Sequence, residues 1–319
     1  MRIAEQTPLN SGFSETTTAS EVVGTQDLSG MTAVVTGGYA GLGLEITKAL
    51  TAAGARVHVP ARRTEVAAAA LAGTPRTYID HMDLADLASV NRYSESLRSE
   101  GNHIDLLINN AGLMGCPLTR VGAGWESQFV VNHLGHYLLV NRLWPLLTGG
   151  ARVVAVSSAG HHFAPIQWHD IHFQNNPYDK WVAYGQAKTA VALFAVHLDA
   201  LGREDGVRAF SVHPGSAPTE LSRHLEQSDF DLLMGMYQTG ELSGQIFKTP
   251  EQGAATALWV GLSPQLIGWG GLYCEDCDIA APAPPDGRFV GVREYARDPE
   301  QAQRLWSHSA ETTQIDAFA

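Results

Sequence analysis

Short apolar runs alternate with longer amphipathic stretches over most of the 319-residue chain. The runs are rich in β-branched residues, which is typical of buried strands, and the stretches between them space apolar residues as helices do. We expect strands near residues 32–36, 55–60, 76–80, 104–108, 151–157, 207–212 and 270–274. We expect helices near residues 41–53, 64–72, 86–99, 125–147, 182–202 and 250–262. This alternation predicts an α/β fold, a doubly wound, seven-stranded parallel sheet with helices on both faces.

One domain covers residues 28–280 in this interpretation, with two flanking segments. Residues 1–27 are polar and rich in Thr and Ser, and we expect a mobile or surface-wrapping arm. Residues 220–249 place apolar side chains among polar ones, which suits either a lid over a cleft or an ordinary packing helix. Residues 281–319 end in a helical pattern and are expected to pack on the domain or on a neighbouring subunit.

The composition narrows the class of partner. A formal net charge of −12 argues against nucleic acid or an anionic membrane. No apolar run is long enough to span a membrane, and residues 1–25 lack the features of a signal peptide. Three cysteines are too few for a disulfide framework, so we expect a cytoplasmic protein.

A glycine-rich turn, TGGYAGLG at residues 36–43, joins the first predicted strand to the first predicted helix. Glycines allow a tight turn and a close approach of the backbone to a phosphate, and a helix N-terminus offers free N–H groups to an anion. Glycines also mark ordinary turns. The flanking strand and helix favour a dinucleotide phosphate site here.

Tyr184 and Lys188 are four residues apart in a predicted helix and therefore share one face. A free phenol titrates near pH 10. An ammonium group about 4 Å away in a partly buried site would favour the phenolate by up to about 4 kcal/mol. Such an effect would lower the pKa of the tyrosine by roughly three units. The pair is predicted to move a proton on and off a substrate oxygen.

Further polar residues follow the strands in a recurrent order. They are Asp83-Leu84, residues 109–112, Asn132, Ser158, Pro214-Gly215 and Thr219. Together with the glycine turn and the Tyr184/Lys188 pair, they resemble the short-chain dehydrogenase/reductase family in its single-domain form, over roughly residues 30 to 275. Residues 125–139, the His-rich stretch after Ser158 and residues 271–277 resemble its retinol-dehydrogenase-like and WW-domain-oxidoreductase-like branch.

The resemblance implies a three-layer Rossmann fold and a set of catalytic roles. Tyr184 would be the general acid/base, and Lys188 would tune it and bond the nicotinamide ribose. Ser158, which the resemblance aligns in preference to Ser157, would hold the substrate oxygen. Asn132 would hold a water that links Lys188 to solvent.

The second strand ends in Arg62-Arg63, where enzymes that prefer NAD carry an acidic residue. Guanidinium groups bind a 2′-phosphate, so NADP(H) is expected rather than NAD(H), unless both arginines are solvated surface residues. The resemblance places Asp83 at the adenine amino group, although Asp83 could instead cap a helix. It places Asn109 and Gly112 on the adenosine side, although Asn109-Asn110 could simply be turn residues. The expected cofactor-binding residues are Gly37, Tyr39, Ala40, Gly41, Leu42, Gly43, Arg62, Arg63, Asp83, Leu84, Asn110, Ala111, Gly112, Tyr184, Lys188, Pro214, Gly215 and Thr219.

Three positions depart from the family pattern. Ala217-Pro218 replaces a branched aliphatic and its neighbour in the loop that would hold the nicotinamide, and Pro218 removes an N–H there. Met31 stands where lysine is common, and Ala187 where serine is common. Neither of the latter positions carries the chemistry.

One cluster of histidines and one pair of cysteines could suggest a metal or redox site. His161, His162, His169 and His172 match no zinc spacing, and no metal is expected. Cys274 and Cys277, at the end of a predicted edge strand, are expected to be packing or surface cysteines. His133 and His136 flank Asn132 and are expected to pack or to support it.

These observations predict an NADP(H)-dependent oxidoreductase that interconverts an apolar carbonyl compound and its alcohol. The alternatives are a ketoreductase that tailors one natural product and a regulatory protein that binds NADP(H) without turnover. The family further implies a homo-oligomer, a dimer or tetramer, formed through the helices that carry Asn132 and Tyr184.

Overall fold

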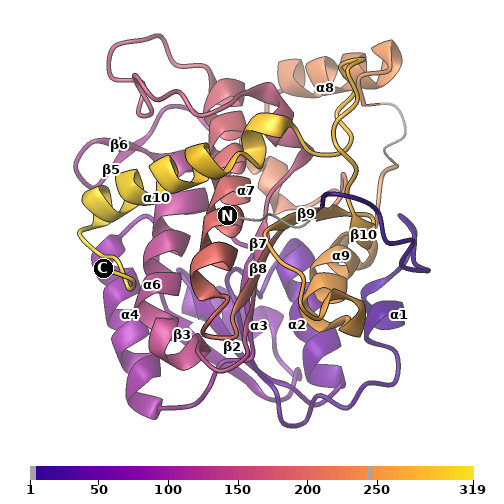
Figure 1. Cartoon of the computed structure of the whole chain (residues 1–319), viewed down its shortest axis with the longest axis vertical. Helices are drawn as coiled ribbons and strands as arrows, with labels where there is room; N and C mark the ends of the chain where they lie inside the picture. Colours follow the sequence, from indigo (N-terminus) through magenta and orange to yellow (C-terminus); the bar gives the residue numbers. More distant parts are fainter. Residues whose placement is uncertain (1–4, 243–245) are drawn as a thin grey trace.

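An eight-stranded sheet forms the centre of the computed structural model, which describes residues 5–242 and 246–319 (Figure 1). The strand order is β10-β9-β8-β7-β4-β1-β2-β3, and all neighbours are parallel except β9 and β10. The bounds are β1 Thr32–Val35, β2 Arg56–Ala61, β3 Thr77–His81, β4 Leu106–Asn109, β7 Arg152–Val156, β8 Arg208–His213, β9 Leu272–Glu275 and β10 Asp278–Ile279. The predicted seven-stranded parallel sheet is confirmed, and β10 extends it by one antiparallel strand.

Helices cover both faces of the sheet, as predicted. Their bounds are α2 Gly41–Ala52, α3 Thr64–Ala70, α4 Leu87–Glu100, α6 Gly135–Leu147, α7 Lys180–Gly202 and α9 Pro250–Leu262. One apolar cluster joins α2 and α9 to the sheet, and another joins α4, α6 and α7 to it. Because parallel strands are buried on both faces, they read as continuous apolar runs, which is why the sequence located them well.

The predicted helix over residues 125–147 is divided into several elements. It begins as a strand, β6 (Trp125–Glu126), which pairs with β5 (Arg120–Val121). The buried carboxylate of Glu126 then accepts bonds from the backbone N–H groups of Gln128 and Phe129, both at 2.8 Å, and so starts the short helix α5 (Ser127–Phe129). A π-helical turn, η1 (Val130–Leu134), connects α5 to α6 and carries Asn132. Such π-turns shift side chains relative to a regular helix.

The N-terminal arm packs along the sheet and α9. The Gln6 amide donates to the carbonyls of Tyr273 and Ala280 at 2.6 and 2.7 Å. The Asp278 carboxylate accepts from the backbone of Leu9 and Ser11. Further on, α1 (Ala19–Val23) buries three apolar side chains against α2 and α9. The described part of the arm therefore lies on the domain surface, and its predicted mobility stays a prediction.

The C-terminal helix α10 (Pro299–Thr313) lies across α6 and α7 (Figure 1). The Trp306 ring packs against the rings of Tyr137 and Phe194, with centroids 4.8 and 5.8 Å apart. Beyond α10, the Ile315 carbonyl accepts a bond from the Tyr137 hydroxyl. The helix faces that were expected to join subunits are thus covered here by the chain's own C-terminus. The oligomeric state itself stays a prediction.

The three cysteines, Cys116, Cys274 and Cys277, are free and buried. Strand β9, which contains Cys274, lies between β8 and β10. The expectation that it is an edge strand is therefore wrong, because the unpredicted β10 pairs with it. Cys274 and Cys277 pack in the core. Within residues 5–242 and 246–319, no helix is both long and apolar enough to cross a membrane.

Candidate active site

A cavity of about 920 Å³ lies at the carboxyl ends of the parallel strands. It runs from the glycine turn after β1, past the ends of β2, β4, β7 and β8, to the segment after β8. This is where ligands bind in open α/β sheets, since the strand order reverses between β1 and β4. The predicted residues that line it are Gly37, Tyr39, Ala40, Gly41, Leu42, Arg62, Arg63, Asp83, Leu84, Asn110, Ala111, Gly112, Ser158, Tyr184, Lys188, Pro214, Gly215 and Thr219. Three predicted residues, Gly43, Asn109 and Asn132, do not line it.

The glycine turn presents a helix N-terminus to this cavity. Gly37 has φ +66°, a left-handed conformation that glycine adopts without strain. Helix α2 begins after Ala40, whose side chain cannot cap it, so its first N–H groups remain available. Gly43 has a packing role: a Cβ there would lie 2.3 Å from the Gly37 carbonyl oxygen. The turn can therefore receive an anion, and Gly43 supports it without facing the cavity.

The structure decides whether Asp83 caps a helix or lines the cavity, and it shows where Asn109 lies. Asp86, not Asp83, caps α4, by accepting from the backbone of Ala88 at 3.0 Å. Asp83 accepts from the Ala85 backbone at 2.9 Å and lines the cavity. Asn109, which was expected beside the adenosine, is buried in β4 and does not line the cavity. That expectation is wrong because the strand runs one residue further before the chain turns outward.

The catalytic side chains come from α7 and from the end of β7. The Ser158 hydroxyl accepts a bond from the Gly160 backbone at 2.9 Å, and it acts on the Tyr184 phenol by lowering the pKa of that phenol. Ser157 is engaged elsewhere, because its hydroxyl donates to the Lys188 carbonyl at 2.8 Å. A Cβ on Gly160 would lie 2.4 Å from a ring carbon of Tyr184. The absence of a side chain at Gly160 therefore allows Tyr184 to reach Ser158.

The electrostatics of the pair differ from the expectation. Burial raises the pKa of Tyr184 to about 12, and the hydrogen bond with Ser158 lowers it only in part. Burial lowers the pKa of Lys188 to about 8. The Lys188 ammonium donates to the Val156 carbonyl at 2.8 Å and lies 5.8 Å from the centre of the Tyr184 ring. The Tyr184 pKa is therefore raised and not lowered as predicted, because desolvation is the largest effect, and Tyr184 is a neutral phenol near pH 7.

Asn132 uses its side-chain amide to hold a loop. The amide accepts from the Leu113 backbone at 2.8 Å and donates to the Leu113 carbonyl at 3.0 Å. Gly112 permits this approach, because a Cβ there would lie 2.8 Å from the Asn132 Oδ1 atom. Asn132 therefore fixes the loop after β4, which lines the cavity, and its predicted role in holding water stays a prediction.

His161 and His133 bond to other parts of the chain. His161 is fully buried and bonds to the carbonyl of Ser158 at 2.8 Å, while its other nitrogen accepts from the backbone of Arg293 at 3.2 Å. Burial holds the pKa of His161 well below its usual range. His133 bonds to the Ser309 hydroxyl at 2.7 Å, outside the cavity. Among the residues that the structure describes, no three His, Cys, Asp or Glu side chains gather as a metal site would require.

Aromatic residues that were not anticipated surround the catalytic end of the cavity. Phe163, Trp181 and Phe289 line it, and the Phe163 ring lies 5.4 Å from Trp181 and 5.1 Å from Phe289. Trp181 could have been found, because it stands three residues before Tyr184 on the same helix face. Phe289 lies in the C-terminal extension, where no local pattern points to the site.

The expected lid covers the same end of the cavity. It contains η3 (Glu220–His224) and α8 (Gln227–Thr239). The Lys180 ammonium binds the Asp229 carboxylate at 2.6 Å and ties α8 to the start of α7. Residues 243–245 of the expected lid lie outside the described residues. Its cavity-lining side chains include Leu221, Leu225, Phe230, Leu233, Met234 and Tyr237.

Solved structures share this architecture. An uncharacterised protein from Mycobacterium paratuberculosis superimposes with a TM-score of 0.73 at 28% identity, over 93% of this chain and 98% of its own. The Pseudomonas aeruginosa protein RhlG, solved as a complex with NADP in its active site, superimposes with a TM-score of 0.61 at 25% identity, over 82% of this chain and 97% of its own.

Proteins similar in sequence point to the same family of folds and enzymes. A Streptomyces lividans protein named "Probable oxidoreductase" is 40% identical over 296 residues, which cover 90% of this chain and 98% of the relative. Mouse (Mus musculus) retinol dehydrogenase 11 is 34% identical over 292 residues, 89% of this chain and 86% of the relative. Residues 31–229 match the family model described as short chain dehydrogenase. The fold, the site and these matches together show that the chain belongs to the short-chain dehydrogenase/reductase family of oxidoreductases.

Proposed function

We propose that this protein is an NADP(H)-dependent oxidoreductase that interconverts an apolar ketone or aldehyde and its alcohol. One observation carries the proposal: Tyr184 and Ser158 meet at the wall of a cavity whose other end is a glycine turn with an uncapped helix N-terminus. The cavity thus joins a proton donor to an anion site, as a reaction with a dinucleotide requires.

The residues of this cavity fit a dinucleotide with an extra phosphate. Pyrophosphate would bind at the N-terminus of α2, where the N–H groups are free and the helix dipole is positive. Arg62 and Arg63, both exposed at the cavity edge after β2, would bind the 2′-phosphate. The NADP named in the RhlG complex supports this choice over NAD. When bound, the reduced nicotinamide supplies a hydride to the carbonyl carbon.

The chain's own residues handle the proton. The Ser158 hydroxyl would hold the carbonyl oxygen, and the neutral Tyr184 phenol would give its proton to that oxygen as negative charge develops there. Lys188, buried beside Tyr184, would stabilise the phenolate that remains until a proton returns to it. In the oxidative direction, Tyr184 would take the proton from the alcohol. With its pKa raised to about 12, the Tyr184 phenol is protonated near pH 7 and carries the proton that carbonyl reduction requires.

The substrate end favours an apolar compound. Aromatic side chains from three separate elements and the apolar face of α8 enclose it. A polar substrate would lose its hydration there without replacement hydrogen bonds. The retinol dehydrogenases among the relatives act, by name, on an apolar alcohol, which supports this substrate class.

Loss of NADPH absorbance with a panel of apolar aldehydes and ketones tests the proposal. Tyr184→Phe should lower kcat by about 10²- to 10⁴-fold while NADPH still binds. Tyr137→Phe is the matched control, since it also removes a buried hydroxyl, but one that bonds to Ile315 away from the cavity. Tight NADPH binding without turnover would favour the regulatory alternative, and full activity of Tyr184→Phe would remove the mechanism.

A further inference from the structure

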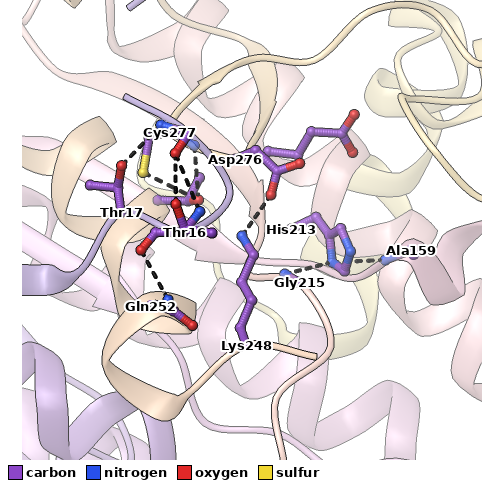
Figure 2. A network of polar contacts seen from close by, with 12 residues as sticks. Thr16, Thr17, Ala159, His213, Gly215, Lys248, Gln252, Asp276 and Cys277 are labelled. Atoms are coloured by element: carbon purple, nitrogen blue, oxygen red, sulfur yellow. Dashed lines mark hydrogen bonds and ion pairs between the residues drawn. The ribbon is translucent and has the colours of Figure 1, made fainter. Parts of the chain in front are cut away.

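His213, the last residue of β8, lies between two loops of the active site (Figure 2). Its Nδ1 atom accepts a bond from the backbone N–H of Ala159 at 3.1 Å and another from that of Gly215 at 3.4 Å. Ala159 follows Ser158, and Gly215 belongs to the loop that would hold the nicotinamide. One ring atom therefore connects the loop at Ser158-Ala159 (the substrate-oxygen loop) to the loop at Gly215 (the nicotinamide loop).

His213 connects the two loops just beyond the point where the backbone hydrogen bonds between β7 and β8 end. The pairing of β7 with β8 ends at Val156 and Val212, and the last backbone bond runs from Ser157 to the Val212 carbonyl. Beyond that point the segments that follow β7 and β8 separate around the cavity. Because both bonds to the His213 Nδ1 atom come from backbone N–H donors, this atom is the acceptor and carries no proton. The rigid ring then fixes the spacing of the two loops.

An ion pair between a buried lysine and a half-exposed aspartate supports the loop at Gly215 from another side (Figure 2). The Lys248 side chain is only 3% exposed, and its ammonium binds the Asp276 carboxylate at 2.6 Å. Its carbon stem runs against Gly215, where a Cβ would lie 2.6 Å from the Lys248 Cε atom. The Lys248 backbone also donates to the Ser216 carbonyl at 2.8 Å. His213 and Gly215 thus separate the main cavity from a small polar cavity that Lys248 and Asp276 border.

We propose that His213 is a positioning residue for hydride transfer, and that the Lys248–Asp276 pair supports the same loop. This inference rests on the proposed function. Hydride transfer requires the substrate oxygen, held by Ser158, and the nicotinamide, held by the loop at Gly215, to keep a fixed separation. A displacement of about 1 Å at such a site costs about 100-fold in rate. His213 is the residue that sets this separation, through a single acceptor atom.

Two substitutions at this position separate positioning from bulk. His213→Leu fills the space but removes the acceptor, whereas His213→Asn keeps an acceptor near the place of Nδ1. His133→Asn is the matched control, because it removes a buried imidazole and its bond to Ser309 outside the cavity. Lys248→Met keeps the stem that packs on Gly215 and removes the charge. The readouts are thermal stability, the Kd of NADPH from fluorescence, and the single-turnover rate with the best carbonyl substrate and its isotope effect with C4-deuterated NADPH.

We expect His213→Leu to slow hydride transfer roughly 10- to 100-fold and His213→Asn to recover most of that loss. Lys248→Met should show a smaller loss of the same kind, and His133→Asn should lower stability without changing the rate. Equal rates for His213→Leu and the wild type would overturn the proposal. It would also be overturned if both His213 variants lost rate equally, in step with their stability. Should His213→Leu fail to fold, His213→Gln, which moves the acceptor one bond outward, takes its place.

The test also separates this inference from the proposed function. If the wild-type protein reduces no carbonyl compound, the proposed function fails. The affinity for NADPH then decides the role of His213 by itself. We expect a Kd about ten-fold higher for His213→Leu and close to the wild-type value for His213→Asn. Equal Kd values for all three proteins would overturn the role of His213 in holding the nicotinamide loop.

Discussion

The Thr36 hydroxyl and the His136 Nε2 atom lie 2.9 Å apart in the buried core between the glycine turn and the π-helical turn. Thr36 also accepts from the backbone of Asn110 and Ala111 at 2.9 and 3.0 Å, and the His136 Nδ1 atom donates to the Asn132 carbonyl at 3.1 Å. Burial lowers the pKa of His136 to about 4, so the ring is neutral near pH 7. A continuous chain of hydrogen bonds therefore joins the anion site to the helix that carries Asn132.

Breaking this series of hydrogen bonds should first lower the stability of the protein. We expect His136→Phe to lower the free energy of unfolding by about 1–3 kcal/mol, because the Thr36 hydroxyl loses its acceptor in a buried place. Thr36→Val alone should have a similar cost. The double variant should cost less than the sum, since each change removes the same bond. Denaturant unfolding of the three variants measures this, and strictly additive losses would show that the two residues are not coupled.

The pH dependence of reduction should follow Lys188. Its pKa is lowered to about 8 by burial, so the ammonium is present below that pH and is lost above it. We expect kcat/KM for carbonyl reduction to be level below about pH 7.5 and to fall as the pH rises through 8. Lys188→Met should remove this inflection together with most of the activity. A wild-type profile that stays level to pH 10 would contradict the assignment.

Cofactor choice should depend on the two arginines after β2. Replacing Arg62 with Asp removes a charge-assisted hydrogen bond and adds repulsion, and we expect the preference for NADPH over NADH to fall roughly 10- to 100-fold. Arg56→Ala is a suitable control, because Arg56 packs over the Tyr78 ring and does not line the cavity. The ratio of kcat/KM for the two cofactors is the measurement. An unchanged ratio in Arg62→Asp and Arg63→Asp would place both arginines in solvent.

Gly160 should be as sensitive to substitution as Tyr184 itself. A methyl group there would lie 2.4 Å from Cε1 of Tyr184 and would push the ring away from Ser158. We expect Gly160→Ala to lower kcat by about 100-fold or more while NADPH binding stays close to normal. Gly30→Ala provides the comparison, since no heavy atom lies within 4 Å of a Cβ there. Wild-type activity in Gly160→Ala would show that the ring can shift without loss.

Glu275 should make stability depend on pH. Burial raises the pKa of this carboxyl to about 7, while one oxygen accepts from the Gly291 backbone at 2.9 Å. The folded state therefore holds the proton more tightly than the unfolded one, and this contribution to stability is lost as the pH rises from about 4.5 through 7. Glu275→Gln keeps an acceptor and avoids the buried charge. It should gain up to about 3 kcal/mol at pH 8 and little at pH 4, as measured by denaturant unfolding.

Features that depend on local residue patterns could be predicted from the amino-acid sequence alone. Buried parallel strands read as apolar runs, and α7 places Tyr184 and Lys188 on one face at four-residue spacing. Once the strands are parallel, their carboxyl ends meet at one edge, so the polar residues that follow them line one cavity. For that reason nearly all of the residues expected to bind the cofactor line the same cavity, and their role in binding stays a prediction.

Features that depend on contacts between distant segments became visible only in the folded structure. The pKa of Tyr184 is raised because the folded chain removes its surroundings from water, which no spacing reveals. The aromatic wall brings Phe289 to Phe163 from the far end of the chain, and α10 covers the face of α6 and α7 that was expected to meet another subunit. His213 connects two loops that only the sheet brings side by side. Sequence periodicity reports which face of an element is buried, whereas the identity of the covering group is fixed by long-range packing.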